Sequence, residues 1–138
     1  MTDKELVARK IALISQDLDE LKSIGRKTVS EFLADKIERF AAERLLERMI
    51  GRMIDINFHV LTDTGQAPPP DYFQSFVKLG ELGALPADFA RQIAPCAGLR
   101  NRLIHEYDEI DPDKLFAGLQ TAVRDIPVYL EHIAKLVE

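Results

Sequence analysis

The fold class is decided by residues 28–62, TVSEFLADKIERFAAERLLERMIGRMIDINFHVLT. Apolar side chains recur along this stretch every three or four residues, with charged side chains between them, which is the period of an amphipathic α-helix. Thr28 and Glu31 have the spacing of a capping box, in which the two side chains bond to free backbone N–H groups at a helix start. The pattern therefore predicts one long helix over roughly residues 30–62.

The apolar surface of this predicted helix is wider than one neighbour in a helical bundle would cover. Leu45, Ile56, Phe58 and Val60 all lie outside the main apolar stripe. Apolar surface that remains after a bundle has packed is available for association with another chain. We therefore expect the protein to form a homodimer.

Helical patterns continue on both sides of this stretch. Prolines and a glycine over residues 62–70 exclude a helix there and predict a loop. No strand-like alternation of useful length and no internal repeat is found. The sequence thus predicts an all-α, up-and-down bundle of four to five helices that forms a single domain, residues 1–138. The further helices are expected over residues 3–24, 72–81, 87–107 and 112–136.

Several residues mark where these helices begin and end. Asp3, Asp71 and Asp111 are suited to cap helix starts, and Gly25 is suited to the left-handed conformation that ends a helix. Pro95 lies inside the pattern of residues 87–107, so we expect a kink or a break there.

Composition limits the function classes that are possible. The 138 residues carry a formal net charge of −5, so the chain as a whole does not attract nucleic acid, and any RNA contact must be local. The single cysteine, Cys96, excludes an internal disulfide and a cysteine-rich zinc site. We find no nucleotide-binding glycine motif, no long apolar run and no signal-peptide pattern, and we expect a cytoplasmic protein without cofactor, metal or membrane span.

Reactive side chains gather in residues 100–107, RNRLIHEY. Histidine exchanges a proton near neutral pH, and arginine carries a permanent planar charge that suits a phosphate. His105 is suited to take the proton from a ribose 2′-hydroxyl, while Arg100 stabilises the charge that develops on the attacked phosphate. Asn101 is placed to orient either the histidine or the phosphate. These residue types allow RNA cleavage without a metal ion.

Helix geometry places Arg100 and Tyr107 on nearly one line, and Asn101 and His105 on a neighbouring line. Arg100 and His105 are about 140° apart around the helix, so they flank a face and need not touch within one chain. A cleft that gathers them requires a partner surface or a second subunit. The alternative is purely structural: Arg100 pairs with Glu106 or Asp108, and His105 caps the helix end.

The run Arg100, Asn101, His105 and Tyr107 resembles the Arg-x4-His-x-Tyr motif of the HepT-like branch of the HEPN superfamily. The resemblance extends to length, helix order and the long second helix. It implies an all-α HEPN-like fold and a homodimeric toxin of the HepT/MntA toxin–antitoxin type. It further implies a metal-independent endoribonuclease with Arg100 and His105 as catalytic residues. The implied partner is a minimal nucleotidyltransferase of the MNT type, an antitoxin that transfers AMP to Tyr107.

Two other functions remain open. One is a non-catalytic helical partner of a minimal nucleotidyltransferase, for which the motif serves only as the acceptor of the nucleotide. The other is a nucleotide-binding subunit of such an enzyme. Both expect no RNA cleavage by the purified protein.

Two further groups of polar residues have competing interpretations. Arg44, Arg48 and Arg52 recur every four residues, which fits a line of phosphate contacts, a surface for an acidic partner, or a face of ion pairs with neighbouring glutamates. Asp55 and His59 offer only two ligands, too few for a metal site, so we expect a structural role.

Overall fold

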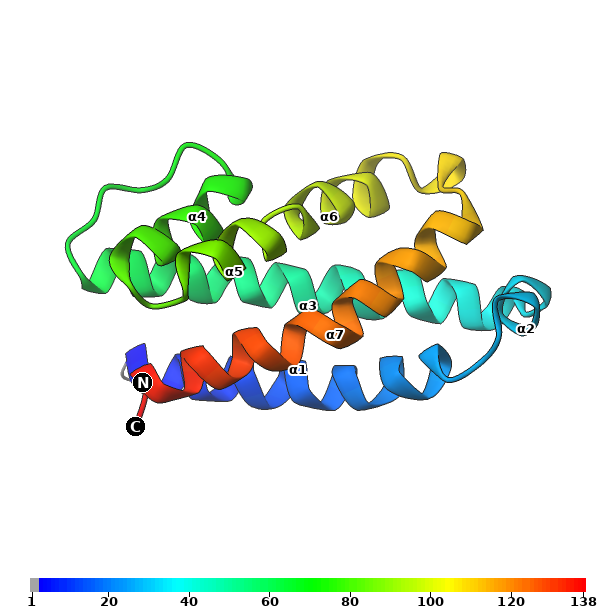
Figure 1. The fold of residues 1–138 in the computed structure, drawn as a ribbon, viewed down its shortest axis with the longest axis horizontal. Coiled ribbons are helices and arrows are strands. Elements are labelled where there is room, and N and C mark those ends of the chain that lie inside the picture. Colours follow the sequence, from blue (N-terminus) through cyan, green and yellow to red (C-terminus); the bar gives the residue numbers. More distant parts are fainter. Residues whose placement is uncertain (1–2) are drawn as a thin grey trace.

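The computed structural model describes residues 3–138, apart from the side chain of Tyr107. Every regular element in this part of the chain is a helix, which confirms the predicted all-α fold (Figure 1). No helix in residues 3–138 is both long and apolar enough to cross a membrane. The elements are α1 (Asp3–Gly25), α2 (Val29–Ala34), α3 (Lys36–Asp63), α4 (Tyr72–Leu82), α5 (Ala87–Ile93), α6 (Cys96–His105), the 3-10 helix η1 (Tyr107–Glu109) and α7 (Pro112–Leu136).

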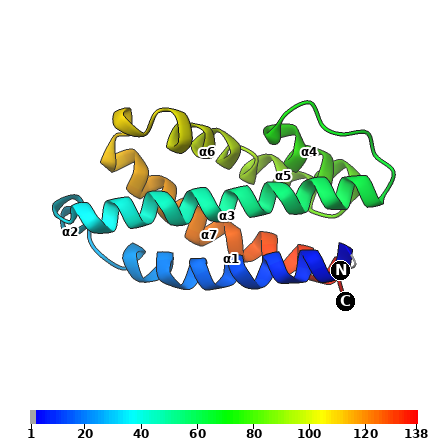
Figure 2. The ribbon, with the colours of Figure 1, turned by 180° about the vertical axis from the view of Figure 1, so that it is seen from behind.

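Helix α3 forms the middle of the bundle. Helix α1 packs along one side of it and α4 and α6 along the other, with α5 packed against α4, while α7 crosses from the end of α6 back to the start of α1 (Figures 1 and 2). The two ends of the described chain therefore lie side by side at one end of the bundle. Helix α6, which carries the Arg-x4-His sequence, is held against α3 and joined to α7 through η1.

The predicted helix over residues 30–62 is divided at Asp35. Thr28 and Glu31 form the predicted capping box, but the helix that they start ends at Ala34. Asp35 has extended backbone angles, and its side chain accepts a hydrogen bond from the backbone N–H of Glu38, so it caps α3 instead of continuing α2. The prediction of one continuous helix was wrong here. An aspartate side chain that bonds to a backbone N–H group favours the cap of a helix over a position inside one.

Glycine and proline positions account for the other helix ends. Gly83 adopts the left-handed conformation that ends α4, whereas Gly25 does not, so the prediction for Gly25 was wrong. A side chain at Gly25 would instead lie 2.9 Å from a methyl group of Leu119, which shows that Gly25 permits close packing of α1 and α7. The break at Pro95 is confirmed, because α5 ends at Ile93 and α6 starts at Cys96. This break and the one at Asp35 explain why residues 3–138 contain seven α-helices.

The core covers the apolar residues that had suggested a dimer. Leu45 and Ile56 are buried within the chain, and Phe58 and Val60 are half-buried and pack against the core. They face other helices of the same chain, so their position gives no support for association. Ile37 is 75% exposed at the start of α3 instead. The homodimer stays a prediction.

A buried polar chain links α7, α3 and α4. The hydroxyl of Tyr129 donates to Asn57 Oδ1 at 2.6 Å, and Asn57 Nδ2 donates to Ser75 Oγ at 3.0 Å. Ser75 Oγ in turn donates to the carbonyl oxygen of Tyr72 at 2.6 Å. Burial raises the pKa of Tyr129 well above its ordinary value, because the charged form has no water around it. This chain fixes the first turn of α4, which bears Tyr72.

Candidate active site

Helix α6 is placed by its apolar face and by the break before it. Pro95 has no N–H, and the chain turns there so that Ala97 and Leu103 enter the core. The polar side chains of the motif consequently point to the sides and the exposed end of α6. Helix α6 ends at His105, because Glu106 leaves helical geometry with φ −130° and ψ 31°.

Arg100 lies half-buried between α3 and α4. Its Nε is 3.3 Å from the position that a side chain at Gly51 would occupy, so the guanidinium rests on the bare backbone of α3. Its Cζ is 5.5 Å from the ring centroid of Tyr72, a cation–π distance. Nε is buried and has no hydrogen-bond partner among the described residues. The site thus holds a permanent positive charge whose Nε–H group has no acceptor among the described residues.

The sequence did not point to Gly51 or Tyr72 as neighbours of Arg100. One signal was present, since an isolated glycine inside a helical pattern often marks a close approach of another group. Which group approaches depends on how α3 and α6 pack, and this cannot be read from the pattern along either helix.

His105 lies at the exposed end of α6. It borders a shallow depression together with Glu106, Asp108 and Glu109. As the last residue of α6 it lies where a positive charge interacts favourably with the helix dipole. Arg100 does not line this depression. One chain therefore places the two residues on different sides of α6, as the helix geometry predicts, and does not gather them in one cleft.

The remaining motif residues are arranged differently from the prediction. Asn101 is exposed near the middle of α6. Tyr107 lies beyond the end of α6, at the start of η1, so the prediction that Arg100 and Tyr107 share one line of a helix was wrong. The side chain of Tyr107 lies outside the described residues.

The purely structural interpretation of Arg100 and His105 finds little support in the described residues. Arg100 forms no ion pair with Glu106 or Asp108 there, and no described hydrogen bond joins His105 to the carbonyl groups at the end of α6. Among the described residues, Arg100 contacts the ring of Tyr72 but no carboxylate.

The arginine row of α3 is a set of ion pairs. Arg44 pairs with Glu47 at 3.1 Å. Arg48 and Arg52 both pair with Asp17 of α1, at 3.3 and 3.0 Å. The ion-pair interpretation is therefore the one that the geometry supports, although two of the three arginines use a carboxylate from another helix.

Other polar residues of α3 and α7 have structural contacts. Asp55 pairs with Lys10 at 3.3 Å, and Asn57 belongs to the buried polar chain of Tyr129. His132 is half-buried, with its ring 6.3 Å from that of Phe89. Burial, and to a smaller extent the charge of Asp125, raises the pKa of the Cys96 thiol, which keeps it protonated and unreactive.

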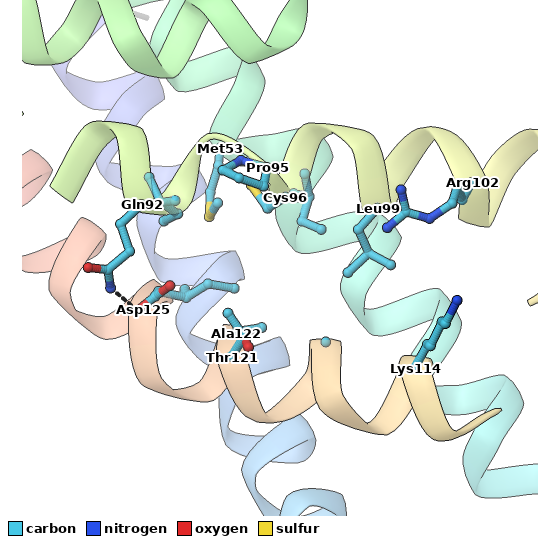
Figure 3. Close-up of a pocket in the computed structure, with 14 residues that line it drawn as sticks. Met53, Gln92, Pro95, Cys96, Leu99, Arg102, Lys114, Thr121, Ala122 and Asp125 are labelled. Carbon is cyan, nitrogen blue, oxygen red and sulfur yellow. Dashed lines mark hydrogen bonds between the residues drawn. The ribbon is translucent and has the colours of Figure 1, made fainter. Parts of the chain in front are cut away.

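A cavity of about 180 Å³ lies between α3, α5, α6 and α7 (Figure 3). Arg102 and Lys114 lie at one end of it, and Gln92 and Asp125 at the other, joined by a hydrogen bond of 2.9 Å from Gln92 Nε2 to Asp125 Oδ1. The sequence does not predict this cavity. Its lining residues come from four helices, and of these Arg102 alone lies within the polar stretch of residues 100–107.

Comparison with known proteins identifies the family of this chain. The model of the family described as ribonuclease HepT-like matches residues 14–133. The tRNA nuclease HepT of Aphanizomenon flos-aquae (strain 2012/KM1/D3) is 35% identical over 128 residues, which cover 93% of this chain and 87% of the relative.

Two solved structures share the fold at low sequence identity. The tri-AMPylated HEPN toxin of Shewanella oneidensis, solved in complex with an MNT antitoxin, has a TM-score of 0.85 at 22% identity, covering 98% of this chain and 99% of that one. The cytosolic protein YutE of Bacillus subtilis, whose function is unknown, has a TM-score of 0.81 at 16% identity, covering 99% and 92% of the two chains. The fold, the match of the family model and the identity to the cyanobacterial relative lead to one conclusion: the chain belongs to the ribonuclease HepT-like family.

Proposed function

We propose that this protein is the toxin of a toxin–antitoxin system and that it cleaves RNA without a metal ion, with Arg100 and His105 as its catalytic residues. The observation that carries the proposal is the 35% identity to a tRNA nuclease over 93% of the chain. That relative also makes tRNA the first substrate to test. We place the activity in the cytoplasm, where tRNA is found.

The setting of Arg100 suits it to bind a phosphate. Its guanidinium has no carboxylate partner among the described residues. A phosphate oxygen in the RNA backbone supplies the negative charge that is missing, and the terminal nitrogens of the guanidinium can donate to it. The ring of Tyr72 and the bare backbone at Gly51 hold the guanidinium in place.

His105 acts as the base. It takes the proton of a ribose 2′-hydroxyl, and the 2′-oxygen attacks the adjacent phosphorus. The bond to the 5′-oxygen of the next nucleotide breaks, and that oxygen leaves with a proton taken from solvent water. The products are a 2′,3′-cyclic phosphate and a 5′-hydroxyl. Arg100 stabilises the charge on the phosphate during the step, and Asn101 orients the reacting groups.

A homodimer completes the site. Within one chain Arg100 faces α3 and α4, whereas His105 faces an acidic depression at the end of α6. Carboxylates alone around His105 would repel an RNA phosphate. We infer that Arg100 of one chain and His105 of the other line a shared cleft. This inference predicts that an Arg100→Ala chain mixed with a His105→Ala chain regains cleavage, because one of the two mixed sites is then intact.

The antitoxin is an MNT-type nucleotidyltransferase that transfers AMP to Tyr107. A structure of this fold is described as a tri-AMPylated toxin bound to an MNT antitoxin. The backbone of Tyr107 begins η1, two residues after His105. AMP on Tyr107 would add bulk and negative charge where the RNA phosphate docks, which inhibits cleavage.

The decisive experiment incubates the purified chain with tRNA in the presence of EDTA. We expect cleavage, products ending in 2′,3′-cyclic phosphate, and a loss of about 10²–10⁴-fold in the His105→Ala variant. His59→Ala, which removes another histidine at the end of a helix, is the matched control and should cleave normally. Equal cleavage by the His105→Ala variant would rule out the proposed base.

A second experiment tests the modification. Co-expression with an MNT-type nucleotidyltransferase should add AMP-sized mass and abolish cleavage. Tyr107→Phe should escape both changes, whereas Tyr72→Phe should not. If the purified chain cuts no RNA but still gains AMP on Tyr107, the protein is a non-catalytic partner of the nucleotidyltransferase.

A further inference from the structure

The cavity between α3, α5, α6 and α7 has the size of one planar ring. Its volume is about 180 Å³, close to the roughly 150 Å³ of an apolar protein cavity that binds benzene. Its walls are largely apolar, and they include Ile50, Met53, Leu99 and Ile126. Gln92, Pro95, Lys114 and Thr121 are exposed at its border, so the cavity is accessible from solvent.

One end of the cavity offers oxygen acceptors. Asp125 is buried, with 3% of its surface exposed. Its Oδ1 accepts from Gln92 Nε2 at 2.9 Å and from Arg124 Nε at 2.8 Å, while Oδ2 accepts, among the described residues, only from Arg124 Nη2 at 3.2 Å. Oδ2 therefore keeps a free lone pair, and the amide oxygen of Gln92 has no described donor. A ligand group at this end must be an N–H or O–H donor.

The other end of the cavity is positively charged. Arg102 and Lys114 are exposed and border the cavity opposite Asp125 (Figure 3). Neither side chain forms an ion pair within the described part of the chain. Two free cations beside a ring-sized apolar cavity suit a ligand that joins a ring to a phosphate.

The cavity is also connected to the candidate active site. Leu99, Arg102 and Lys114 border a neighbouring depression as well, which extends to Glu106 and Glu109. These two glutamates also border the depression of His105. A continuous surface therefore leads from His105 to the cavity along α6.

We propose that this cavity binds the cytosine base of a cytidine nucleotide. The exocyclic amino group of cytosine donates to Asp125, the ring fills the apolar part, and the phosphate binds Arg102 and Lys114. Uracil has the same size but presents a carbonyl oxygen at that position, which the carboxylate repels. The nucleotide is either a free cytidine monophosphate or a cytidine of RNA, and only the RNA source depends on the ribonuclease function proposed above.

The test compares the binding of cytidine 5′-monophosphate and uridine 5′-monophosphate to the purified chain by calorimetry and by NMR shifts of the cavity residues. We expect cytidine monophosphate to bind about tenfold more tightly. Asp125→Asn should remove this preference. Lys114→Ala replaces an exposed residue, so this variant should fold even if Asp125→Asn does not. It should weaken the binding of both nucleotides equally. Equal affinity of the two nucleotides for the wild-type chain, or no binding of either, would overturn the proposal.

A second measurement separates the two sources of the nucleotide. Short RNAs that differ by one cytidine-to-uridine change should be cleaved at different rates if the cavity reads the substrate. Unequal binding of the mononucleotides with equal cleavage of the RNAs assigns the cavity to free nucleotides. Unequal binding without any cleavage overturns the ribonuclease function and leaves the nucleotide site standing.

Discussion

The arginines of α3 and Arg100 of α6 share a residue type and a helical setting but differ in their partners. Arg48 and Arg52 converge on the buried carboxylate of Asp17. Arg100 lies on a glycine backbone and a tyrosine ring, and its buried Nε has no hydrogen-bond partner among the described residues. An arginine that a carboxylate already neutralises stabilises the fold, whereas one held in place without a carboxylate is available to an anion.

Replacing Arg100 should give the largest difference in cleavage rate between Arg100 and the arginines of α3. Arg100→Ala should lower the rate of tRNA cleavage by about 10²–10³-fold, because the charge that stabilises the attacked phosphate is lost. The free energy of unfolding should change little, since no ion pair is broken. Arg44→Ala, which removes an exposed ion pair, is the control and should leave the rate unchanged. Comparable losses of cleavage rate in Arg100→Ala and Arg44→Ala would show that Arg100 does not differ from the ion-paired arginines of α3.

Replacing Asp17 tests the ion-paired arginines of α3. Asp17→Ala leaves Arg48 and Arg52 without their shared carboxylate and should lower the free energy of unfolding by about 2 kcal/mol. Cleavage measured well below the unfolding transition should stay normal. Urea denaturation checks the stability, with the exposed Asp19→Ala on the same helix as control. If Asp17→Ala is as stable as the control, the ion pairs of α3 are not structural.

Gly51 allows the position of Arg100 to be changed without removing its charge. A Cβ at residue 51 would lie 3.3 Å from Arg100 Nε, so Gly51→Ala should displace the guanidinium and slow cleavage by about tenfold. Stability should stay level or rise by up to about 1 kcal/mol, because alanine favours a helix. Gly98→Ala is the control, since its nearest neighbour would be Arg102 Nη1 at 3.6 Å, an ordinary contact. Unchanged kinetics in Gly51→Ala would show that the position of the guanidinium does not matter.

The ring of Tyr72 gives the smallest expected effect. Tyr72→Leu removes the cation–π interaction with Arg100 and should reduce cleavage by about two- to fivefold. Tyr72→Phe keeps the ring and should retain the wild-type rate. The two variants are compared by their kcat and KM values for tRNA. A loss in Tyr72→Phe as large as that in Tyr72→Leu would assign the effect to the hydroxyl rather than to the ring.

Most of the fold was predictable because it depends on local signals. The capping box of Thr28 and Glu31, the cap at Asp71 and the break at Pro95 are each confirmed. The errors at Asp35 and Gly25 have a common cause. An aspartate or a glycine has several uses in a helical protein, and the neighbouring helices decide which of them applies.

The candidate site was predictable in its residues but not in its surroundings. Arg100, Asn101, His105 and Tyr107 stand within eight residues of one another, so the sequence shows them together. The cavity that Asp125 borders was not predictable from the sequence, because its hydrogen-bonded pair, Gln92 and Asp125, is 33 residues apart. Contacts between distant helices leave no periodic trace along the chain.

The sequence by itself determined the all-α class, most helix boundaries and the choice of candidate catalytic residues, because spacing, caps and residue chemistry act over a few positions. Only the tertiary structure decided which charges are neutralised. It pairs Arg48 and Arg52 with a carboxylate of another helix, and it leaves Arg100 beside Gly51 and Tyr72. Ion pairing depends on distances between helices, and these distances are set by how the apolar faces of the bundle pack together.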